Sequence, residues 1–221
     1  MTLEIKKAML FAAGRGERLR PLTDRTPKPL LPIGDKPLID YSLSYLKRYG
    51  IEEVVINLWH LGKKIERHVG DGKKFGLRIF YSKEKELLGT GGGLKNAEKY
   101  FENEKAFITL NSDTLINCDL KELEEFHAAQ QNPATLVVTK WQEGYTRFNV
   151  DGKDYLFTGL AVLSPVIFKN LTLKTTNLIT QGVISNFSAF VHEDFWQDIG
   201  TPQNYKAAQE EWASAHGPRI S

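Results

Sequence analysis

The chain has 221 residues, of which 41% are apolar and 25% are charged; these are ordinary values for a globular protein and exclude a disordered chain or a disulfide scaffold. The formal net charge of +2 is too balanced to indicate nucleic-acid binding, and no apolar run reaches the ~18 residues of a membrane span. The lone Cys118 fits a reducing compartment. We therefore expect a cytoplasmic protein of one domain that binds neither nucleic acid nor a membrane.

The first 140 residues alternate short apolar runs with helical patterns. Strands are expected at 7–13, 54–56, 77–81, 106–110 and 135–139. Helices are expected at 37–50, at 61–70, from about Leu94, and around 120–126. This alternation predicts a parallel sheet with helices on both faces.

The pattern changes from Trp141 onward. The pair Asp151-Gly152 predicts the turn of a hairpin, followed by a strand at 155–163. Thr201-Pro202 predicts the start of a C-terminal helix.

A glycine-rich, cationic loop follows the first strand. Gly14 and Gly16 permit a close backbone approach to an anion. A P-loop is excluded because no Gly-Lys-Ser/Thr ends the loop, and a dinucleotide fingerprint is excluded because Leu19 occupies the third glycine position. Prolines exclude a helix through 14–37. Phosphate binding is predicted by the cations that crowd this segment: Arg15, Arg18, Arg20, Arg25 and Lys28.

Two carboxylates stand out later in the chain. Asp113 follows the expected strand at 106–110, and Asp198 precedes the C-terminal helix. If they meet at a phosphate site they could hold Mg²⁺, whereas a lone carboxylate at a strand end is also typical of a turn or cap. Their separation in sequence leaves both interpretations open. The five histidines lack zinc-ligand spacing.

Residues 10–32, LFAAGRGERLRPLTDRTPKPLLP, closely resemble the signature of nucleoside-triphosphate:sugar-1-phosphate nucleotidyltransferases. Residues 88–93, 111–113 and 198–202 match further motifs in the expected order. Among short members of the family, the chain is most similar to N-acetylmuramate-1-phosphate uridylyltransferases and mannose-1-phosphate guanylyltransferase-like proteins.

The resemblance implies a Rossmann-like, three-layer α/β fold with a mixed, mostly parallel central sheet and helices on both faces. Residues 1–140 would form the nucleotide-binding half, and 141–221 the sugar-binding half with the C-terminal helix. The implied reaction transfers a nucleotidyl group from an NTP to a sugar-1-phosphate with Mg²⁺ as cofactor, giving an NDP-sugar and pyrophosphate.

The resemblance also implies a role for each matching residue. Arg18, Lys28 and Asp113 would be catalytic, and Asp113 and Asp198 would hold Mg²⁺. Thr158 and Gly159 would border the sugar. The nucleotide would contact Ala12, Ala13, Gly14, Gly16, Glu84, Gly89 and Thr90.

Two departures leave the acceptor open. The Glu-Lys-Pro motif of many relatives is absent from 144–156, so no lysine is assigned to the sugar phosphate, and Thr158 stands where many relatives have asparagine. Glu84 could accept from guanine or uracil, so the choice of UTP with N-acetylmuramate-1-phosphate follows the resemblance. The alternatives are GTP with mannose- or heptose-1-phosphate, a non-catalytic nucleotide-sugar sensor, and transfer to phosphocholine through an aromatic cage of Trp141, Tyr145 and Trp196. The sequence predicts no oligomeric state.

Overall fold

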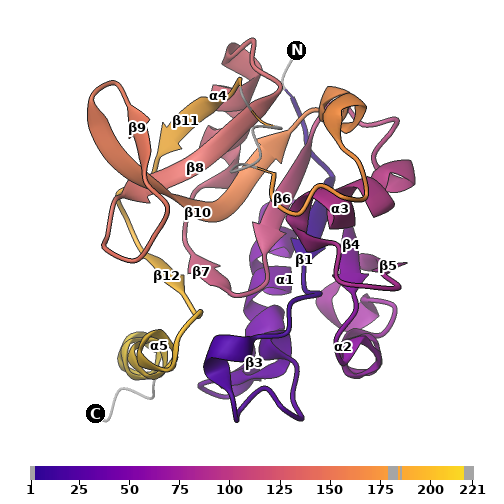
Figure 1. Cartoon of the computed structure of the whole chain (residues 1–221), viewed down its shortest axis with the longest axis vertical. Helices are drawn as coiled ribbons and strands as arrows, with labels where there is room; N and C mark the ends of the chain where they lie inside the picture. Colours follow the sequence, from indigo (N-terminus) through magenta and orange to yellow (C-terminus); the bar gives the residue numbers. More distant parts are fainter. Residues whose placement is uncertain (1–2, 179–183, 185, 217–221) are drawn as a thin grey trace.

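The fold is built on one eight-stranded mixed sheet with the order β11-β8-β10-β6-β1-β4-β5, in which β9 pairs with β10 (Figure 1). A computed structural model describes residues 3–178, 184 and 186–216. The strands are β1 (Lys7–Phe11), β4 (Glu53–Leu58), β5 (Arg78–Lys83), β6 (Phe107–Asn111), β8 (Ala134–Lys140), β9 (Phe148–Val150), β10 (Lys153–Leu163) and β11 (Ser188–Val191).

Most neighbouring strands run parallel, as expected. β1 pairs in parallel with β4 and β6, β4 with β5, and β8 with β11. The long strand β10 runs antiparallel between β6 and β8, so β8 does not lie beside the other strands of the first 140 residues. The two halves expected from the sequence therefore share one sheet.

Alternation along the strands divides the core between the two faces of the sheet. Ala8 and Leu10 of β1 point to one face, which is covered by α1 (Leu38–Arg48), α2 (Gly62–Val69) and α4 (Leu120–Ala129). Met9 points to the other face, beneath α3 (Gly89–Asn96), η4 (Glu98–Tyr100) and η5 (Pro165–Asn170). The predicted helical layers on both faces are confirmed.

A small accessory unit carries the chain into the C-terminal helix. β7 (Thr114–Ile116) pairs antiparallel with β12 (Trp196–Asp198), and α5 (Pro202–His216) follows directly. Ala208 of α5 packs with Ile33, Leu38, Leu115 and Ile199 in a third buried cluster. None of the described helices is long and apolar enough to cross a membrane.

No α-helix lies within the described residues 14–37, as the prolines predicted, but one expected helix start is wrong. The proline-rich segment contains the 3₁₀ turns η1 (Glu17–Leu19) and η2 (Lys28–Leu30) and a hairpin of β2 (Pro32–Ile33) with β3 (Lys36–Pro37). Pro29 is tolerated because it lies at the beginning of η2, where its missing N–H is not needed. Helix α3 begins at Gly89 and not near Leu94, so the glycines form its first turns.

The remaining 3₁₀ turn, η3 (Lys73–Phe75), connects α2 to β5. The hairpin turn predicted from sequence is confirmed, since Asp151 and Gly152 both have positive φ, 51° and 78°, between β9 and β10.

Candidate active site

The glycine-rich loop leaves the sheet at the carboxyl end of β1 and folds back on itself. Ala12 and Ala13 are buried, and the Ala12 N–H donates to Asn57 Oδ1 at 2.7 Å. Gly16 has a φ of 65°, and a Cβ there would lie 2.9 Å from Thr23 Cγ2 and 3.1 Å from Lys28 Cβ. Only glycine fits this turn, because a side chain would strain the backbone and displace Lys28.

Three of the five predicted cations reach the cavity beside this loop. Arg15, Arg18 and Lys28 line it, together with Trp59. Lys28 is 9% exposed, and its Nζ lies 2.5 Å from Asp113 Oδ2. The Arg15 guanidinium lies over the Trp59 ring, 4.8 Å from its centroid, which restrains an otherwise flexible cation.

The other two cations of the segment, Arg20 and Arg25, do not line either cavity of the site. Both are exposed, and Arg20 pairs with Asp24 at 3.4 Å. The structure therefore reduces the predicted phosphate cluster to the cations nearest Gly14 and Asp113.

The two carboxylates are brought together by the pairing of β7 with β12. Asp198 lies opposite Thr114 in this ladder, and the Ile199 N–H donates to the Asp113 carbonyl at 2.9 Å. Burial, followed by the negative charge of Asp113, raises the pKa of Asp198. Two neighbouring carboxylates form a donor set that suits Mg²⁺, which prefers one or two carboxylates plus phosphate oxygens.

Arg18 reaches the same place from the glycine-rich loop. A Cβ on Gly200 would collide with both the Arg18 guanidinium and the Asp198 carboxylate. Gly200 therefore leaves the room in which these two groups approach each other.

Glu84, which is predicted to contact the nucleotide, is buried, and each of its two carboxylate oxygens accepts a hydrogen bond from the protein. Oε1 accepts from Asn57 Nδ2 at 2.7 Å, and Oε2 accepts from the Leu88 N–H at 3.0 Å. Burial raises the pKa of Glu84. The carboxylate thus shapes the segment between β5 and α3, and its contact with a base stays a prediction.

Asn57 is a site residue that the sequence reasoning missed. Its side chain joins the glycine-rich loop, through Ala12, to Glu84 and hence to the start of α3. The available signal was an amide near the end of the otherwise apolar run 54–58. Asn57 is 2% exposed and also lines a cavity of the site.

The start of α3 lies against a later segment of the chain. Gly89 has a φ of 73°. The Thr90 N–H donates to the Thr176 carbonyl at 3.0 Å, and Thr90 Oγ1 accepts from the Leu178 N–H at 3.3 Å. Gly89, Thr90 and Thr176 therefore line the same cavity, and a contact of Gly89 or Thr90 with a nucleotide stays a prediction.

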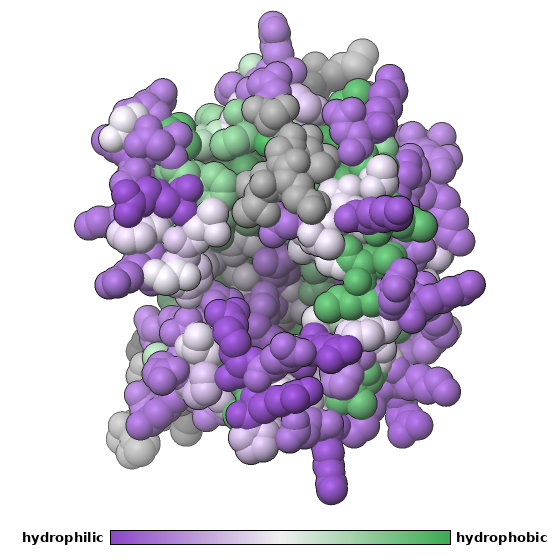
Figure 2. Space-filling view, in the orientation of Figure 1, coloured by the Kyte–Doolittle hydropathy of each residue, from purple (hydrophilic) through white to green (hydrophobic). Residues whose placement is uncertain are grey.

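Two adjoining cavities collect these residues. One, of about 330 Å³, is lined by Ala12, Ala13, Gly89 and Thr90, and the other, of about 720 Å³, holds the cations. They share Gly14, Lys28, Leu87 and Asp113. Figure 2 shows a hollow near the middle of this face with hydrophilic side chains along its lower border.

The predicted acceptor residues lie at an irregularity in β10. Thr158 is 2% exposed, and its hydroxyl donates to the Val137 carbonyl at 2.8 Å, so the side chain is used within the sheet. Gly159 has a φ of 92°, and a Cβ there would lie 2.7 Å from Asn111 Nδ2. A direct contact of the Thr158 hydroxyl with a sugar stays a prediction.

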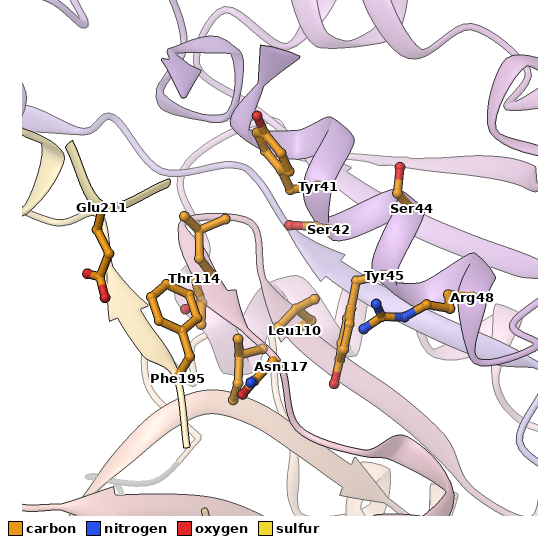
Figure 3. Close-up of a pocket in the computed structure, with 12 residues that line it drawn as sticks. Tyr41, Ser42, Ser44, Tyr45, Arg48, Leu110, Thr114, Asn117, Phe195 and Glu211 are labelled. Atoms are coloured by element: carbon orange, nitrogen blue, oxygen red, sulfur yellow. The ribbon is translucent and has the colours of Figure 1, made fainter. Parts of the chain in front are cut away.

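A separate cavity of about 530 Å³ lies between α1 and β7 (Figure 3). Its lining includes Tyr45, Arg48, Asn117 and Phe195, and it contains none of the residues predicted for the site. Nine of the predicted residues instead line the two cavities beside the glycine-rich loop, whereas Glu84, Thr158, Gly159 and Asp198 line neither of them.

Comparison with known proteins places this arrangement in a family. The family model described as "Nucleotidyl transferase" matches residues 7–150. The N-acetylmuramate alpha-1-phosphate uridylyltransferase of Neisseria meningitidis serogroup B is 34% identical over 92% of this chain and 96% of its own length. The D-glycero-alpha-D-manno-heptose 1-phosphate guanylyltransferase of Campylobacter jejuni is 30% identical over 90% of this chain and 96% of its length.

Solved structures agree on the fold. HddC from Yersinia pseudotuberculosis superposes with a TM-score of 0.81 at 24% identity, covering 94% of this chain and 100% of that one. A glucose-1-phosphate thymidylyltransferase-like structure from Bacillus anthracis, itself described as putative, gives a TM-score of 0.78 at 20% identity, with 93% and 94% covered. The resemblance seen in the sequence is confirmed, and the chain belongs to the nucleotidyl transferase family.

Proposed function

We propose that this protein transfers a uridylyl group from UTP to N-acetylmuramate-1-phosphate, releasing pyrophosphate. The observation that supports the reaction class is that Arg18, Lys28 and Asp113 line one cavity, with Asp198 close enough to Asp113 for the negative charge of Asp113 to raise its pKa. The choice of base and sugar is supported by the Neisseria relative, which matches this chain over nearly the full length of both.

The proposed reaction needs no general base from the protein. A phosphate monoester has a second pKa of about 6, so the sugar-1-phosphate is largely a dianion at pH 7. One of its oxygens attacks the α-phosphorus of the NTP while the bond from that phosphorus to the bridging oxygen breaks. The electron pair leaves with pyrophosphate, and no proton has to move.

The activation barrier of this reaction is largely electrostatic, and the charged residues of the site can lower it. Two anions must approach each other, and charge grows on the departing pyrophosphate, so fixed cations stabilise the transition state. Arg15, Arg18 and Lys28 are the cations placed to do so. Asp113 and Asp198 would hold Mg²⁺, which when bound neutralises phosphate charge.

The acceptor would enter beside Gly159, where the missing side chain leaves room next to Asn111. The aromatic cage needed for phosphocholine is not formed, because the Arg147 guanidinium already covers Trp141 at 4.4 Å from the ring centroid. Tyr145 and Trp196 meet edge to face, with centroids 5.5 Å apart. A sugar phosphate is therefore the better supported acceptor.

GTP with a heptose- or mannose-1-phosphate is the second candidate, since the Campylobacter relative is a heptose-1-phosphate guanylyltransferase. A non-catalytic sensor is less well supported, because the cations and both carboxylates are present.

We place the enzyme in the cytoplasm as a single domain. Its free Cys118 is buried, and burial raises the pKa of the thiol to about 12.

The deciding experiment measures pyrophosphate release with Mg²⁺ across five NTPs, each paired with N-acetylmuramate-, mannose-, glucose-, N-acetylglucosamine- and heptose-1-phosphate. We expect UTP with N-acetylmuramate-1-phosphate to be the productive pair. Turnover with GTP and heptose- or mannose-1-phosphate would transfer the assignment to the second candidate. Absence of turnover with every pair, while nucleotide sugars still raise the melting temperature, would favour the sensor.

The variant Asp113→Asn tests whether Asp113 holds the Mg²⁺ ion. We expect it to abolish Mg²⁺-dependent turnover, because the amide removes one of the two carboxylates. Unchanged activity in this variant would show that Asp113 does not hold the cation.

A further inference from the structure

The Asp198 carboxylate has a neutral partner opposite the cations of the site. The Tyr145 hydroxyl donates to Asp198 Oδ2 at 3.2 Å. Tyr145 belongs to the segment between β8 and β9, far in sequence from both carboxylates of the site. The contact therefore joins the segment between β8 and β9 to the carboxylate proposed to hold a cation.

The direction of this hydrogen bond is set by a second residue. Asn204 Nδ2 donates to the Tyr145 hydroxyl oxygen at 3.1 Å. A phenol has one proton to donate, and its oxygen accepts from others. With the amide of Asn204 filling an acceptor position, the tyrosine proton is directed toward Asp198.

Tyr145 and Asn204 are both held in place by further contacts. The Asn204 N–H donates to Thr201 Oγ1 at 3.2 Å, which fixes the residue in the first turn of α5. The Tyr145 ring packs edge to face on Trp196, and the Trp141 Nε1–H donates to the Tyr145 carbonyl at 3.0 Å. The hydroxyl therefore reaches Asp198 from a fixed position.

A stronger partner for Asp198 lies nearby, and its charge acts on the Asp198 carboxylate without direct contact. The Arg18 guanidinium approaches Asp198 closely enough that a Cβ on Gly200 would touch both. Within the described part of the chain, however, Arg18 and Asp198 form no ion pair. An arginine–carboxylate pair would normally be preferred to a long bond from a neutral hydroxyl.

We infer that Tyr145, supported by Asn204, is a positioning residue that keeps the Asp198 carboxylate available to a divalent cation by preventing it from pairing with Arg18. This inference rests on the proposed function for the identity of the cation site. It goes beyond that function in assigning a role to a neutral side chain from the segment between β8 and β9. It also explains how Arg18 stays free for phosphate.

The test measures binding of Mn²⁺ alone to the full chain, by the loss of the electron paramagnetic resonance signal of free Mn²⁺. We expect Tyr145→Phe to weaken Mn²⁺ binding about 3–10-fold, and Asn204→Ala to weaken it less. The control is Tyr205→Phe, which removes another tyrosine hydroxyl of this region, one that donates to the Pro32 carbonyl at 2.8 Å. Mn²⁺ binding by this control should equal that of the wild type.

A double-mutant cycle identifies the cause. If Arg18 captures Asp198 when the hydroxyl is lost, Tyr145→Phe should have no further effect on Mn²⁺ binding in the Arg18→Ala background. Equal Mn²⁺ binding by wild type and Tyr145→Phe would overturn the inference, and so would a Tyr145→Phe effect that persists without Arg18.

Kinetics separates this inference from the proposed function. We expect Tyr145→Phe to raise the Mg²⁺ concentration needed for half-maximal pyrophosphate release, with kcat near that of the wild type at saturating Mg²⁺. A fall in kcat with unchanged Mg²⁺ dependence would overturn the positioning role. If no substrate pair turns over, the proposed function fails, and Mn²⁺ binding still decides the role of Tyr145.

Discussion

Replacing Gly91 by alanine sets two opposing effects against each other in α3. Alanine is the better helix former by about 1 kcal/mol, so local propensity predicts a more stable protein. The structure predicts the opposite, because a Cβ on Gly91 would lie 2.6 Å from the Thr175 carbonyl oxygen. Ordinary contact begins at 3.4 Å, so the carbonyl would have to retreat by about 0.8 Å (3.4 − 2.6).

The cost of this movement outweighs the gain in propensity. Overpacking typically costs about 1–3 kcal/mol. The same movement disturbs the bonds from the Gly92 N–H to the Thr175 carbonyl and from the Thr90 N–H to the Thr176 carbonyl, which contribute about 1 kcal/mol each. We expect Gly91→Ala to lower the free energy of unfolding by about 2 kcal/mol, which lowers Tm by about 4–8 °C.

The variant should also bind nucleotide less well, because Thr176 lines the cavity proposed for the nucleotide, beside Gly89. The assay combines thermal unfolding with the KM for the NTP in pyrophosphate release, and we expect that KM to rise several-fold. Gly70→Ala is the control: the φ of 65° and ψ of −139° at Gly70 carry a backbone penalty of about 1–3 kcal/mol for alanine, and no atom lies within 4 Å of the new Cβ. It should lose stability without a change in KM. A higher Tm and an unchanged KM for Gly91→Ala would refute the reasoning.

Three further predictions follow from charge, packing and titration. Arg18→Ala should slow pyrophosphate release by about 10²–10³-fold with little change in Tm, because the side chain is exposed and faces the phosphate cavity; a wild-type rate would exclude a phosphate role. Phe107→Ala should cost about 3–5 kcal/mol in urea unfolding, since the ring is fully buried and stacks on Phe101 at 4.3 Å between centroids; a loss below about 1 kcal/mol would contradict this packing. Burial raises the pKa of Glu124 from 4.5 to about 7, so the native state favours the protonated form and the wild type loses stability as pH rises from about 4.5 through 7. Glu124→Gln should therefore stabilise by about 1 kcal/mol at pH 8, after allowance for solvent screening, and by little at pH 4.5, and an equal effect in chemical unfolding at both values would show that the carboxyl is not perturbed.

The parts of the fold that the sequence predicts best depend on one local pattern. In α1, Ile39, Leu43 and Leu46 recur at helical spacing, and all three are fully buried against the sheet. The hairpin at Asp151-Gly152 likewise follows from two residues that tolerate positive φ. In these places local propensity and tertiary packing favour the same conformation.

Long-range pairing decides the features that the sequence could not predict. The place of β10 depends on the register of Leu160 with Leu110, and no local pattern specifies which strand lies beside which. Similarly, Gly91 has low helical propensity yet lies within α3, because the Thr175 backbone packs where a side chain would be. Tertiary contact overrides propensity there.

The site shows the same division. The cations of the glycine-rich loop are local in sequence, and three of the five predicted cations line the cavity beside Gly14, whereas Arg20 and Arg25 do not. The approach of Asp113 to Asp198 depends on the pairing of β7 with β12, so the spacing left it open. The inward hydrogen bonds of Glu84 and Thr158 could be seen only once their partners were placed.

The order of the strands has a consequence for how the chain is made. The ribosome releases β6 and β8 before β10, yet β10 is the neighbour of both strands in the sheet. Until Leu160 emerges, β6 presents an unpaired edge next to Asp113, and a nascent chain ending at Lys140 has a last strand with no partner. We therefore expect the phosphate cavity to mature late in synthesis, and a fragment cut after Lys140 to aggregate rather than bind nucleotide.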